Sequence, residues 1–416
     1  MQRTVKLRVR VDHRTYSALR EVEREYREVL EDAIAYGLQN KTTSFVRIKA
    51  GIYRVERERH RNLPSHYIYA ACEDASERLD SFEKLRRRGR ARAPRPAVRR
   101  VAVHLDDHLW RLGLDRVAIA AKGGWVYISP TFHKLFWRYY NGGWKVAGEA
   151  RFRLLKENVV ELYIVFKKDE PQPYEPRGFV PVDLNEDNVA VMVDGRPVLL
   201  ETGVKRMTLG YYYRRRRMTE GRSTKARSAR RALRRLRERE RKLDMRWKLA
   251  NLIVRAASEA RYAVVLENLP KRAPEHMVRD TDDRQLRLRI YRAAFSSMKE
   301  AIVEKARERG VPVVLVNPAY TSSTCPVHWA RIVYPPDGGN APRVGRCSVG
   351  GELWHRDVAA LYNLLRRAGD GRPVPLASTG THDPPTVEAG RWLRAKSLRP
   401  TMNGHKVIEV KAQGQT

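Results

Sequence analysis

Residues 178–185 decide the fold: their sequence is GFVPVDLN, an apolar run that ends in an aspartate at position 183. A second apolar run, VAVMV at residues 189–193, follows after a turn rich in Asn and Asp. Short apolar runs separated by such a turn predict a pair of buried β-strands. A carboxylate in a buried strand is costly unless it is paired or bound to a metal ion. Asp183 therefore needs a partner, either one of the many arginines or a metal.

Two further acids occupy comparable positions in the chain. Residues 262–270, with the sequence YAVVLENLP, deliver Glu267 at the carboxyl end of an apolar run. Open α/β sheets place their chemistry at that end of their strands. Asp357 opens a predicted helix with apolar residues at helical spacing, although the helix dipole alone also favours an acid there. Strand and helix patterns alternate from residue 177 to about 367, which predicts an α/β domain.

Three acids on apolar elements of a basic chain indicate a metal-dependent site. Phosphodiester cleavage by two divalent ions, about 4 Å apart, needs several carboxylates at one point. One ion activates water and the other stabilises the leaving oxygen. Mg²⁺ prefers the oxygen ligands that Asp and Glu supply. We therefore predict two Mg²⁺ ions held by Asp183, Glu267 and Asp357.

The net charge indicates a polyanionic partner. Lys and Arg number 83 and Asp and Glu 48, which gives a net charge of +35 and a pI of about 10.5. Such an excess destabilises a compact state unless a polyanion offsets it. A protein that binds a membrane surface would concentrate its charge on an amphipathic helix, whereas here the charge is spread along the chain. Nucleic acid is the predicted partner, and a membrane is not.

One segment has the largest local charge. Residues 222–248 hold thirteen Lys or Arg and three acids, with apolar residues at helical spacing. We predict one long helix with a packed apolar stripe and a cationic remainder that binds a nucleic-acid backbone. The preceding run YYYRRRR at residues 211–217 adds rings on which bases can stack. The predicted nucleic-acid contacts are Arg214, Arg215, Arg230, Arg234, Arg237 and Arg241.

The cysteine count and the hydropathy pattern predict a compartment. Cys72, Cys325 and Cys347 are too few for a disulfide scaffold, which favours a reducing environment. No apolar run reaches the length of about 18 residues that spans a membrane. The residues after Met1 show no signal-peptide pattern. We therefore expect a cytoplasmic protein.

The N-terminal part has a different pattern. Residues 4–11 alternate apolar and basic residues, which predicts a half-exposed strand. Residues 16–38 and 65–85 have helical periodicity, and strand patterns dominate residues 98–168. We predict a small β-barrel or sheet that includes the first strand, with the helices as an insertion between its strands.

The order of the motifs resembles a known family. An Asp-bearing strand, an Arg-rich helix, the strand VVLENL, a Thr-Ser-x-x-Cys segment and an Arg-Asp-x-Ala-Ala-x-x-Asn helix follow one another between residues 177 and 367. This set is similar to TnpB, the transposon-associated OrfB-type proteins ancestral to type V CRISPR effectors. Each motif alone is common, and the set is specific. The N-terminal half resembles the family in organisation only.

The resemblance implies an RNase H-like RuvC nuclease domain with Asp183, Glu267 and Asp357 as its catalytic acids. It also implies a β-barrel wedge domain with a helical recognition insertion. A guide RNA from the transposon end would pair with double-stranded target DNA, while the protein, favoured as a monomer, reads a short flanking motif. The predicted boundaries are 1–11 and 98–170 for the wedge, 12–97 for the recognition insertion and a basic linker, 177–320 and 351–367 for the nuclease domain, 321–350 for a zinc-ribbon-like target-loading insertion, and 368–416 for a largely mobile tail.

The ribbon segment departs from the family pattern. The family's zinc ribbon normally has two Cys-x-x-Cys pairs, whereas this chain has CPVH at residues 325–328 and CSVG at residues 347–350. Cys325, His328 and Cys347 remain as candidate ligands, and structural zinc sites are almost always four-coordinate. Two alternatives are open: His355 supplies the fourth ligand, or the site has lost its metal.

Three functions compete at this point. The first is an RNA-guided DNA endonuclease that cleaves next to a flanking motif. The second is a nuclease-silent RNA-guided DNA-binding repressor, and the third is a generic basic RNA-binding protein. The intact set of acids favours the endonuclease, the altered ribbon slightly favours the repressor, and the third leaves the acids at strand ends unexplained.

Overall fold

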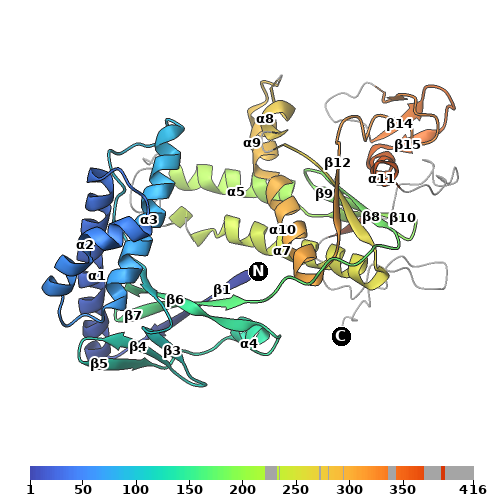
Figure 1. Cartoon of the computed structure of the whole chain (residues 1–416). Coiled ribbons are helices and arrows are strands. Elements are labelled where there is room, and N and C mark those ends of the chain that lie inside the picture. The colour runs from blue at the N-terminus through green and yellow to red at the C-terminus, as the bar shows by residue number, and fades with distance from the viewer. Residues whose placement is uncertain are drawn as a thin grey trace. The chain divides into compact units, whose positions relative to one another are not determined.

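The computed structural model of the chain describes residues 1–220, 232–233, 235–270, 273–279, 281–293, 295–335, 343–369 and 386–388. The chain divides into two compact units, Met1–Asp169 and Glu170–Thr416, which Figure 1 colours from blue to green and from green to red. The domain boundaries proposed from the sequence stay predictions.

The strands of the first unit form two sheets, where the sequence predicted one barrel or sheet. The first strand joins the larger sheet, because β1 pairs antiparallel with β7 from Gln2 opposite Lys167 to Arg10 opposite Val159. The larger sheet has the order β1-β7-β6-β2 and the smaller β3-β4-β5. Their bounds are β1 Gln2–Arg10, β2 Val103–Leu105, β3 Trp110–Leu112, β4 Val117–Ala121, β5 Gly124–Ile128, β6 Lys145–Leu155 and β7 Val159–Lys167, with helix α4 at Lys134–Tyr140.

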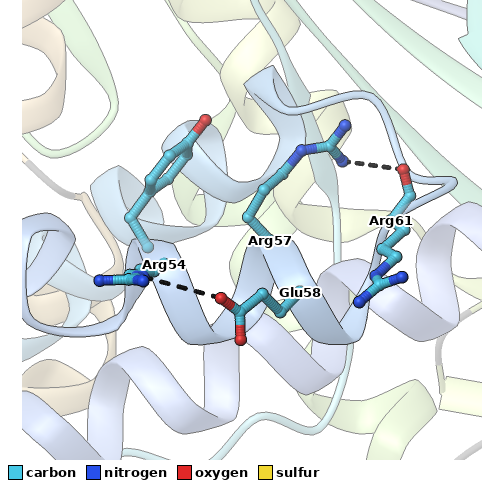
Figure 2. Close-up of a pocket in the computed structure, with 5 residues that line it drawn as sticks. Arg54, Arg57, Glu58 and Arg61 are labelled. Carbon is cyan, nitrogen blue, oxygen red and sulfur yellow. Dashed lines mark hydrogen bonds and ion pairs between the residues drawn. The ribbon is translucent and has the colours of Figure 1, made fainter.

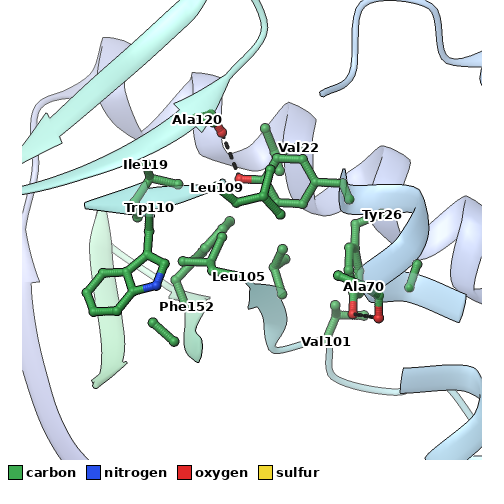
Figure 3. Packing of buried hydrophobic residues seen from close by; sticks show 14 of the residues in the cluster. Val22, Tyr26, Ala70, Val101, Leu105, Leu109, Trp110, Ile119, Ala120 and Phe152 are labelled. Carbon is green, nitrogen blue, oxygen red and sulfur yellow. Dashed lines mark hydrogen bonds between the residues drawn. The ribbon is translucent and has the colours of Figure 1, made fainter. Parts of the chain in front are cut away.

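Three helices lie between β1 and β2 in the chain and share one hydrophobic core with both sheets (Figure 3). The hydroxyl of Tyr26 donates to the carbonyl of Ala70 at 3.1 Å, and that of Tyr67 to the carbonyl of Ala120 in β4 at 2.7 Å. Buried tyrosines that keep a hydrogen-bond partner join the helices to each other and to the smaller sheet. The helices are α1 His13–Gln39, α2 Phe45–Arg59 and α3 His66–Arg87.

The second unit is a mixed α/β fold around a six-stranded sheet, as predicted. The strand order is β12-β11-β8-β9-β10-β16. The strands β8, β9 and β10 are antiparallel neighbours, whereas β11 runs parallel to β8 and β12 parallel to β11. The bounds are β8 Phe179–Leu184, β9 Asn188–Val193, β10 Arg196–Glu201, β11 Ala263–Glu267, β12 Val313–Val316 and β16 Thr386–Glu388.

Helices cover both faces of this sheet. The core on one face joins valines of β8 and β9 to α7 and α10, and the core on the other joins Ala190 and Met192 to α11. Neighbouring residues of β9 divide between the two cores because strand side chains alternate. The helices are α5 Val204–Thr219, α7 Glu238–Ala260, α8 Ala273–Met277, α9 Arg284–Ala293, α10 Phe295–Arg309 and α11 Arg356–Arg367.

A small three-stranded sheet separates β12 from α11 in the chain. Its order is β13-β14-β15, with both pairs antiparallel. The strands are β13 Ile332–Val333, β14 Val344–Cys347 and β15 Leu353–His355. This segment corresponds to the ribbon of the sequence analysis, and β15 leads directly into α11.

The predicted long basic helix is interrupted. Arg237 has a φ of 51°, in the left-handed region, and α7 begins only at Glu238. In α7 the expected apolar stripe holds in part, because Ala250 is buried and Trp247 packs against the core, whereas Leu243 is 41% exposed. Residues 221–231 and 234, which include the predicted contacts Arg230 and Arg234, lie outside the described residues.

Part of the segment predicted as a mobile tail pairs with the sheet. Leu199 to Glu201 of β10 lie opposite Thr386 to Glu388 of β16 in parallel register. The rest of the tail beyond residue 369 lies outside the described residues. Among the helices that the structure describes, none is both long and apolar enough to cross a membrane.

Candidate active site

Side-chain alternation places Asp183 on one face of the six-stranded sheet. Val180 and Val182 of β8 belong to the core that α7 and α10 cover. Neighbouring residues of a strand point to opposite faces, so Asp183 lies on the face that α11 covers. Asp183 is 7% exposed, because α11 packs directly on β8.

Glu267 lies on the same face and at the same level of the sheet. β11 and β8 are parallel, with Leu266 opposite Val182. The next residues of the two strands, Glu267 and Asp183, are therefore neighbours across the ladder. Leu266 packs in the core of the α7 face, so alternation turns Glu267 toward α11. The two carboxylates therefore lie at the carboxyl ends of neighbouring parallel strands.

Asp357 completes the group from the helix that covers this face. It lies in the first turn of α11 and is 2% exposed. The burial of Asp183 and then the negative charges of Glu267 and Asp357 raise the pKa of Asp183 to about 8. The structure thus brings the three predicted acids into one site.

The electrostatics of the site penalise its negative charges. Burial also raises the pKa of Glu267, although a hydrogen bond from Thr321 and the charge of Arg367 oppose the rise. Buried carboxylates that face one another can share a proton or bind a cation, and either lowers the free energy of the site. A divalent cation does so at neutral pH without removing the negative charges of the carboxylates.

The donor set fits magnesium. All three groups offer carboxylate oxygens, which Mg²⁺ prefers and which softer metals do not select. Among the described residues, the three acids do not form a cluster in which every ligand atom lies within 4.8 Å of the others.

Three polar residues that the sequence analysis did not assign orient these acids. The amide of Asn185 donates to Oδ2 of Asp183 at 2.9 Å, and the hydroxyl of Thr321 donates to Oε1 of Glu267 at 2.7 Å. Asn363 of α11 donates to the carbonyl of Thr321 at 2.7 Å. Thr321 and Asn363 could have been found from the sequence. Thr321 belongs to the Thr-Ser-x-x-Cys motif, and Asn363 belongs to the Arg-Asp-x-Ala-Ala-x-x-Asn motif.

Asp357 has positive neighbours that reach solvent. Nη1 of Arg343 lies 3.4 Å from Oδ2 of Asp357, and Nε of Arg356 lies 3.7 Å from Oδ1. The backbone N–H of Asp357 donates to Nδ1 of His355 at 3.3 Å, which caps the start of α11. Because both arginine side chains are more than one third exposed, they can turn away when another cation approaches.

The ribbon cysteines form a possible metal site in which Glu352 takes the place predicted for His355. One ligand atom from each of Cys325, His328, Cys347 and Glu352 lies within 4.8 Å of all the others. His355 is outside this cluster in the part of the chain that the structure describes. The physical reason is its position at the junction of β15 and α11, where its ring caps the helix.

The predicted nucleic-acid contacts that the structure describes lie on α5 and around the start of α7. Arg214 and Arg241 are exposed, and the Arg214 guanidinium lies 5.9 Å from the ring centre of Tyr211. Arg215 and Arg237 each form an ion pair with a glutamate in the first turn of α7. Part of the predicted cationic surface is therefore paired within the protein.

Figure 2 shows a basic pocket of about 350 Å³ in the first unit, lined by Tyr53, Arg54, Arg57, Glu58 and Arg61. Nη1 of Arg57 donates to three carbonyl oxygens of the loop after α2, at 2.8 to 3.2 Å. Arg54 pairs with Glu58 at 3.7 Å and is 93% exposed. Arg57 thus holds the loop, while the other two arginines face solvent.

Two family models match parts of the chain. The family described as "Uncharacterized protein MJ0013 family" matches residues 22–120. The model described as "Cas12f1-like, TNB domain" matches residues 295–364. The second match covers α10, the ribbon cluster and the start of α11, which carries Asp357.

Two relatives from Methanocaldococcus jannaschii and one solved structure are similar to the chain. "Uncharacterized protein MJ0857" is 27% identical over 205 residues, which are 45% of this chain and 75% of the relative. "TnpB-like protein MJ0751" is 24% identical over 256 residues, which are 58% of this chain and 85% of the relative. A structure titled "Cryo-EM structure of the Cas12f1-sgRNA-target DNA complex" aligns at a TM-score of 0.50 and 11% identity, over 88% of this chain and 98% of that chain. At this identity the structural likeness concerns the fold alone.

Proposed function

We propose, since the chain is TnpB-like and carries a Cas12f1-like TNB domain, that it is an RNA-guided DNA endonuclease with an RNase H-like RuvC active site. The reaction would be two-metal hydrolysis of a phosphodiester bond in target DNA next to a short flanking motif. Asp183, Glu267 and Asp357 are the proposed catalytic and magnesium-binding residues.

One observation carries this proposal. Asp183 and Glu267 are side by side at the ends of parallel strands, and Asp357 approaches them from α11. Asp357 pairs with two arginines, whereas burial and the charges of two other acids raise the pKa of Asp183. Clusters with such perturbed pKa values are typical of functional sites.

The residues of the site have distinct proposed roles. When bound, two Mg²⁺ ions would supply an activated water and stabilise the leaving oxygen. Asp183, Glu267 and Asp357 would together hold these ions, and the charges of Glu267 and Asp357 both act on Asp183. Asn185 and Thr321 hold the first two carboxylates in orientation through hydrogen bonds of 2.9 and 2.7 Å.

The proposed partners are a guide RNA from the transposon end and a double-stranded DNA target. The net charge of +35 needs a polyanion, and the solved structure with the same fold is a complex with sgRNA and target DNA. Exposed arginines of α5 and α7, including Arg214 and Arg241, are proposed to contact the nucleic-acid backbone.

A co-purification and cleavage experiment tests the proposal. The protein is expressed with the RNA encoded around its own gene, and the nucleic acid that elutes with it in high salt is sequenced. Matching double-stranded DNA with a randomised flank is then offered with Mg²⁺. Asp183→Ala is compared with Asp115→Ala, a matched control whose side chain is 82% exposed in the first unit.

We expect a defined RNA and Mg²⁺-dependent cleavage that Asp183→Ala reduces by about 10³-fold or more, which is about 4 kcal/mol of transition-state stabilisation. Asp115→Ala should cleave like the wild type. Tight RNA-guided DNA binding without cleavage by the wild type would instead identify the repressor. The absence of any discrete RNA would refute both guided functions.

A further inference from the structure

The ribbon cluster contains two loops with the same backbone geometry. The backbone N–H of the third residue after each cysteine points at the cysteine sulfur. His328 N lies 3.4 Å from Sγ of Cys325, and Gly350 N lies 3.4 Å from Sγ of Cys347. The N–H four positions after each cysteine donates to the cysteine carbonyl, at 3.0 and 3.1 Å. That residue has a positive φ in both loops, 59° at Trp329 and 72° at Gly351. Both loops therefore direct amide dipoles at sulfur, which stabilises a metal-bound thiolate.

The two loops differ at a single ligand position. His328 supplies a ring nitrogen in the first loop, and the equivalent residue of the second loop is Gly350. A Cβ at Gly350 would lie 2.1 Å from Cε1 of His328 and 2.2 Å from Oε2 of Glu352. The space of a fourth ligand at this position is already filled by the carboxylate of Glu352. The lack of space for a Cβ therefore explains why residue 350 is a glycine. Its backbone conformation does not require one, because its φ lies outside the left-handed region.

We infer that Glu352 is the fourth ligand of a structural zinc site that it forms with Cys325, His328 and Cys347. Nδ1 of His328 lies 3.7 Å from Sγ of Cys325 and 3.6 Å from Sγ of Cys347. Tetrahedral zinc, with bonds of about 2.3 Å to sulfur and 2.0 Å to nitrogen, separates these two atom types by about 3.5 Å. Oε1 of Glu352 lies at hydrogen-bond distance from the same groups, 2.8 Å from Sγ of Cys325 and 2.9 Å from Nδ1 of His328, and tetrahedral zinc would hold it about 0.5 Å farther from each.

The surroundings of the cluster favour zinc over the metal of the acidic site. Both cysteines are buried, and two thiolates with an imidazole and a carboxylate suit zinc, whereas Mg²⁺ avoids sulfur. Nε1 of Trp354 donates to Oε1 of Glu352 at 3.2 Å. Hydrogen bonds of this kind orient a ligating carboxylate.

The position of the cluster gives it a structural role. The ribbon begins after Thr321, which contacts Glu267. It leads through β15 into α11, which carries Asp357 in its first turn. A metal that joins the two loops would therefore fix both chain ends that reach the acidic site. The inference does not depend on the proposed nuclease activity, because a repressor with the same ribbon would hold the same metal.

Metal content of the full-length protein tests the inference without any measurement of activity. We expect one zinc per chain by elemental mass spectrometry, after purification under reducing conditions. Glu352→Gln keeps the size of the side chain, and we expect it to weaken zinc binding at least about tenfold in competition with a chelator. His355→Ala removes the rival ligand and should keep the wild-type affinity.

A second measurement keeps the test decisive if a variant fails to fold. X-ray absorption of the zinc-loaded wild type should show two sulfur ligands, two nitrogen or oxygen ligands, and scattering from a single imidazole. Scattering from two imidazoles, or loss of zinc in His355→Ala with unchanged affinity in Glu352→Gln, would overturn the assignment of Glu352. A wild-type chain that takes up no zinc after reconstitution would refute the site.

Discussion

Glu161 of β7 and Asp183 of β8 are both buried acids on β-strands, one in each unit, and their environments are opposite. Glu161 is 0% exposed and accepts hydrogen bonds from Arg8 at 2.6 Å and Tyr163 at 2.8 Å, beside a further ion pair with Arg153. Burial acts to raise its pKa, but these hydrogen bonds and charges lower the pKa to about 2.

Asp183 has no comparable cationic contact among the described residues, and the neutral amide of Asn185 donates the hydrogen bond to its carboxylate. Burial and the charges of Glu267 and Asp357 raise its pKa to about 8. A chain with 83 Lys and Arg residues neutralises one buried acid with arginine and leaves another facing two acids. The difference separates a carboxylate that stabilises the fold from one that the fold holds at a cost.

Glu161→Gln tests the paired acid and has the largest expected effect on stability. It leaves two guanidiniums without their carboxylate, so we expect the free energy of unfolding at pH 7 to fall by about 2–3 kcal/mol. The folded-state pKa of Glu161, about 2, lies below the ordinary value of 4.5. The stabilisation is therefore complete above that ordinary value and is lost as the pH falls toward 2.

Urea unfolding at pH 7 and at pH 3 measures this difference. Glu157→Gln is the matched control, because its side chain is 81% exposed in the turn before β7. Equal stability of Glu161→Gln and the wild type at pH 7 would show that the arginine pairs contribute nothing.

Asp183→Asn tests the unpaired acid and should change stability in the opposite direction. The folded-state pKa of about 8 lies above the ordinary value of 3.8, so wild-type stability falls as the pH rises between these values. In EDTA at pH 8 we expect the variant to be more stable by about 1–2 kcal/mol, or about 2–8 °C in melting temperature. The gain should be smaller at pH 5.

Thermal melts in EDTA at both pH values measure this effect. Added Mg²⁺ should then raise the melting temperature of the wild type more than that of Asp183→Asn, because the ion binds the folded state. A variant less stable than the wild type at pH 8 in EDTA would contradict the repulsion between the acids.

Thr321→Val has the smallest expected effect and probes the second acid. The hydrogen bond from Thr321 lowers the pKa of Glu267, in opposition to burial. Loss of this hydrogen bond is worth about 1 kcal/mol. It should move the acid limb of the pH–rate profile of the proposed DNA cleavage to higher pH by about half to one unit. An unshifted acid limb would show that Thr321 does not act on Glu267 during the reaction.

The strands that carry the acids could be predicted from the sequence because their signal is local. Residues 179–183 and 263–267 are short apolar runs that end in an acid, and both lie in strands of the sheet. The helix from Phe45 to Arg59 lies in the segment predicted as a helical insertion but was not singled out, because only Ile48, Ile52 and Glu56 of its fifteen residues are buried. An apolar stripe this thin gives little periodicity to detect.

The break at Arg237 was also beyond sequence reasoning. Basic residues at helical spacing continue through this position. Arg237 has a left-handed φ of 51°, which residues other than glycine rarely adopt. The ion pair of Arg215 with Glu238 at 2.5 Å and the hydrogen bond from Lys242 to Thr208 at 2.6 Å join α7 to α5. Such long-range contacts decide where α7 begins.

Strand runs, helix periodicity and residue spacing are local properties, so the α/β order of the second unit, the three acids and the candidate ligands Cys325, His328 and Cys347 could all be predicted from the sequence. Only the tertiary structure decided which groups meet. Glu352 and His355 are three residues apart and both can bind zinc, yet Glu352 enters the cluster while His355 caps α11. Strand pairing and the start of the helix set the direction of each side chain, and neither is encoded in residue spacing.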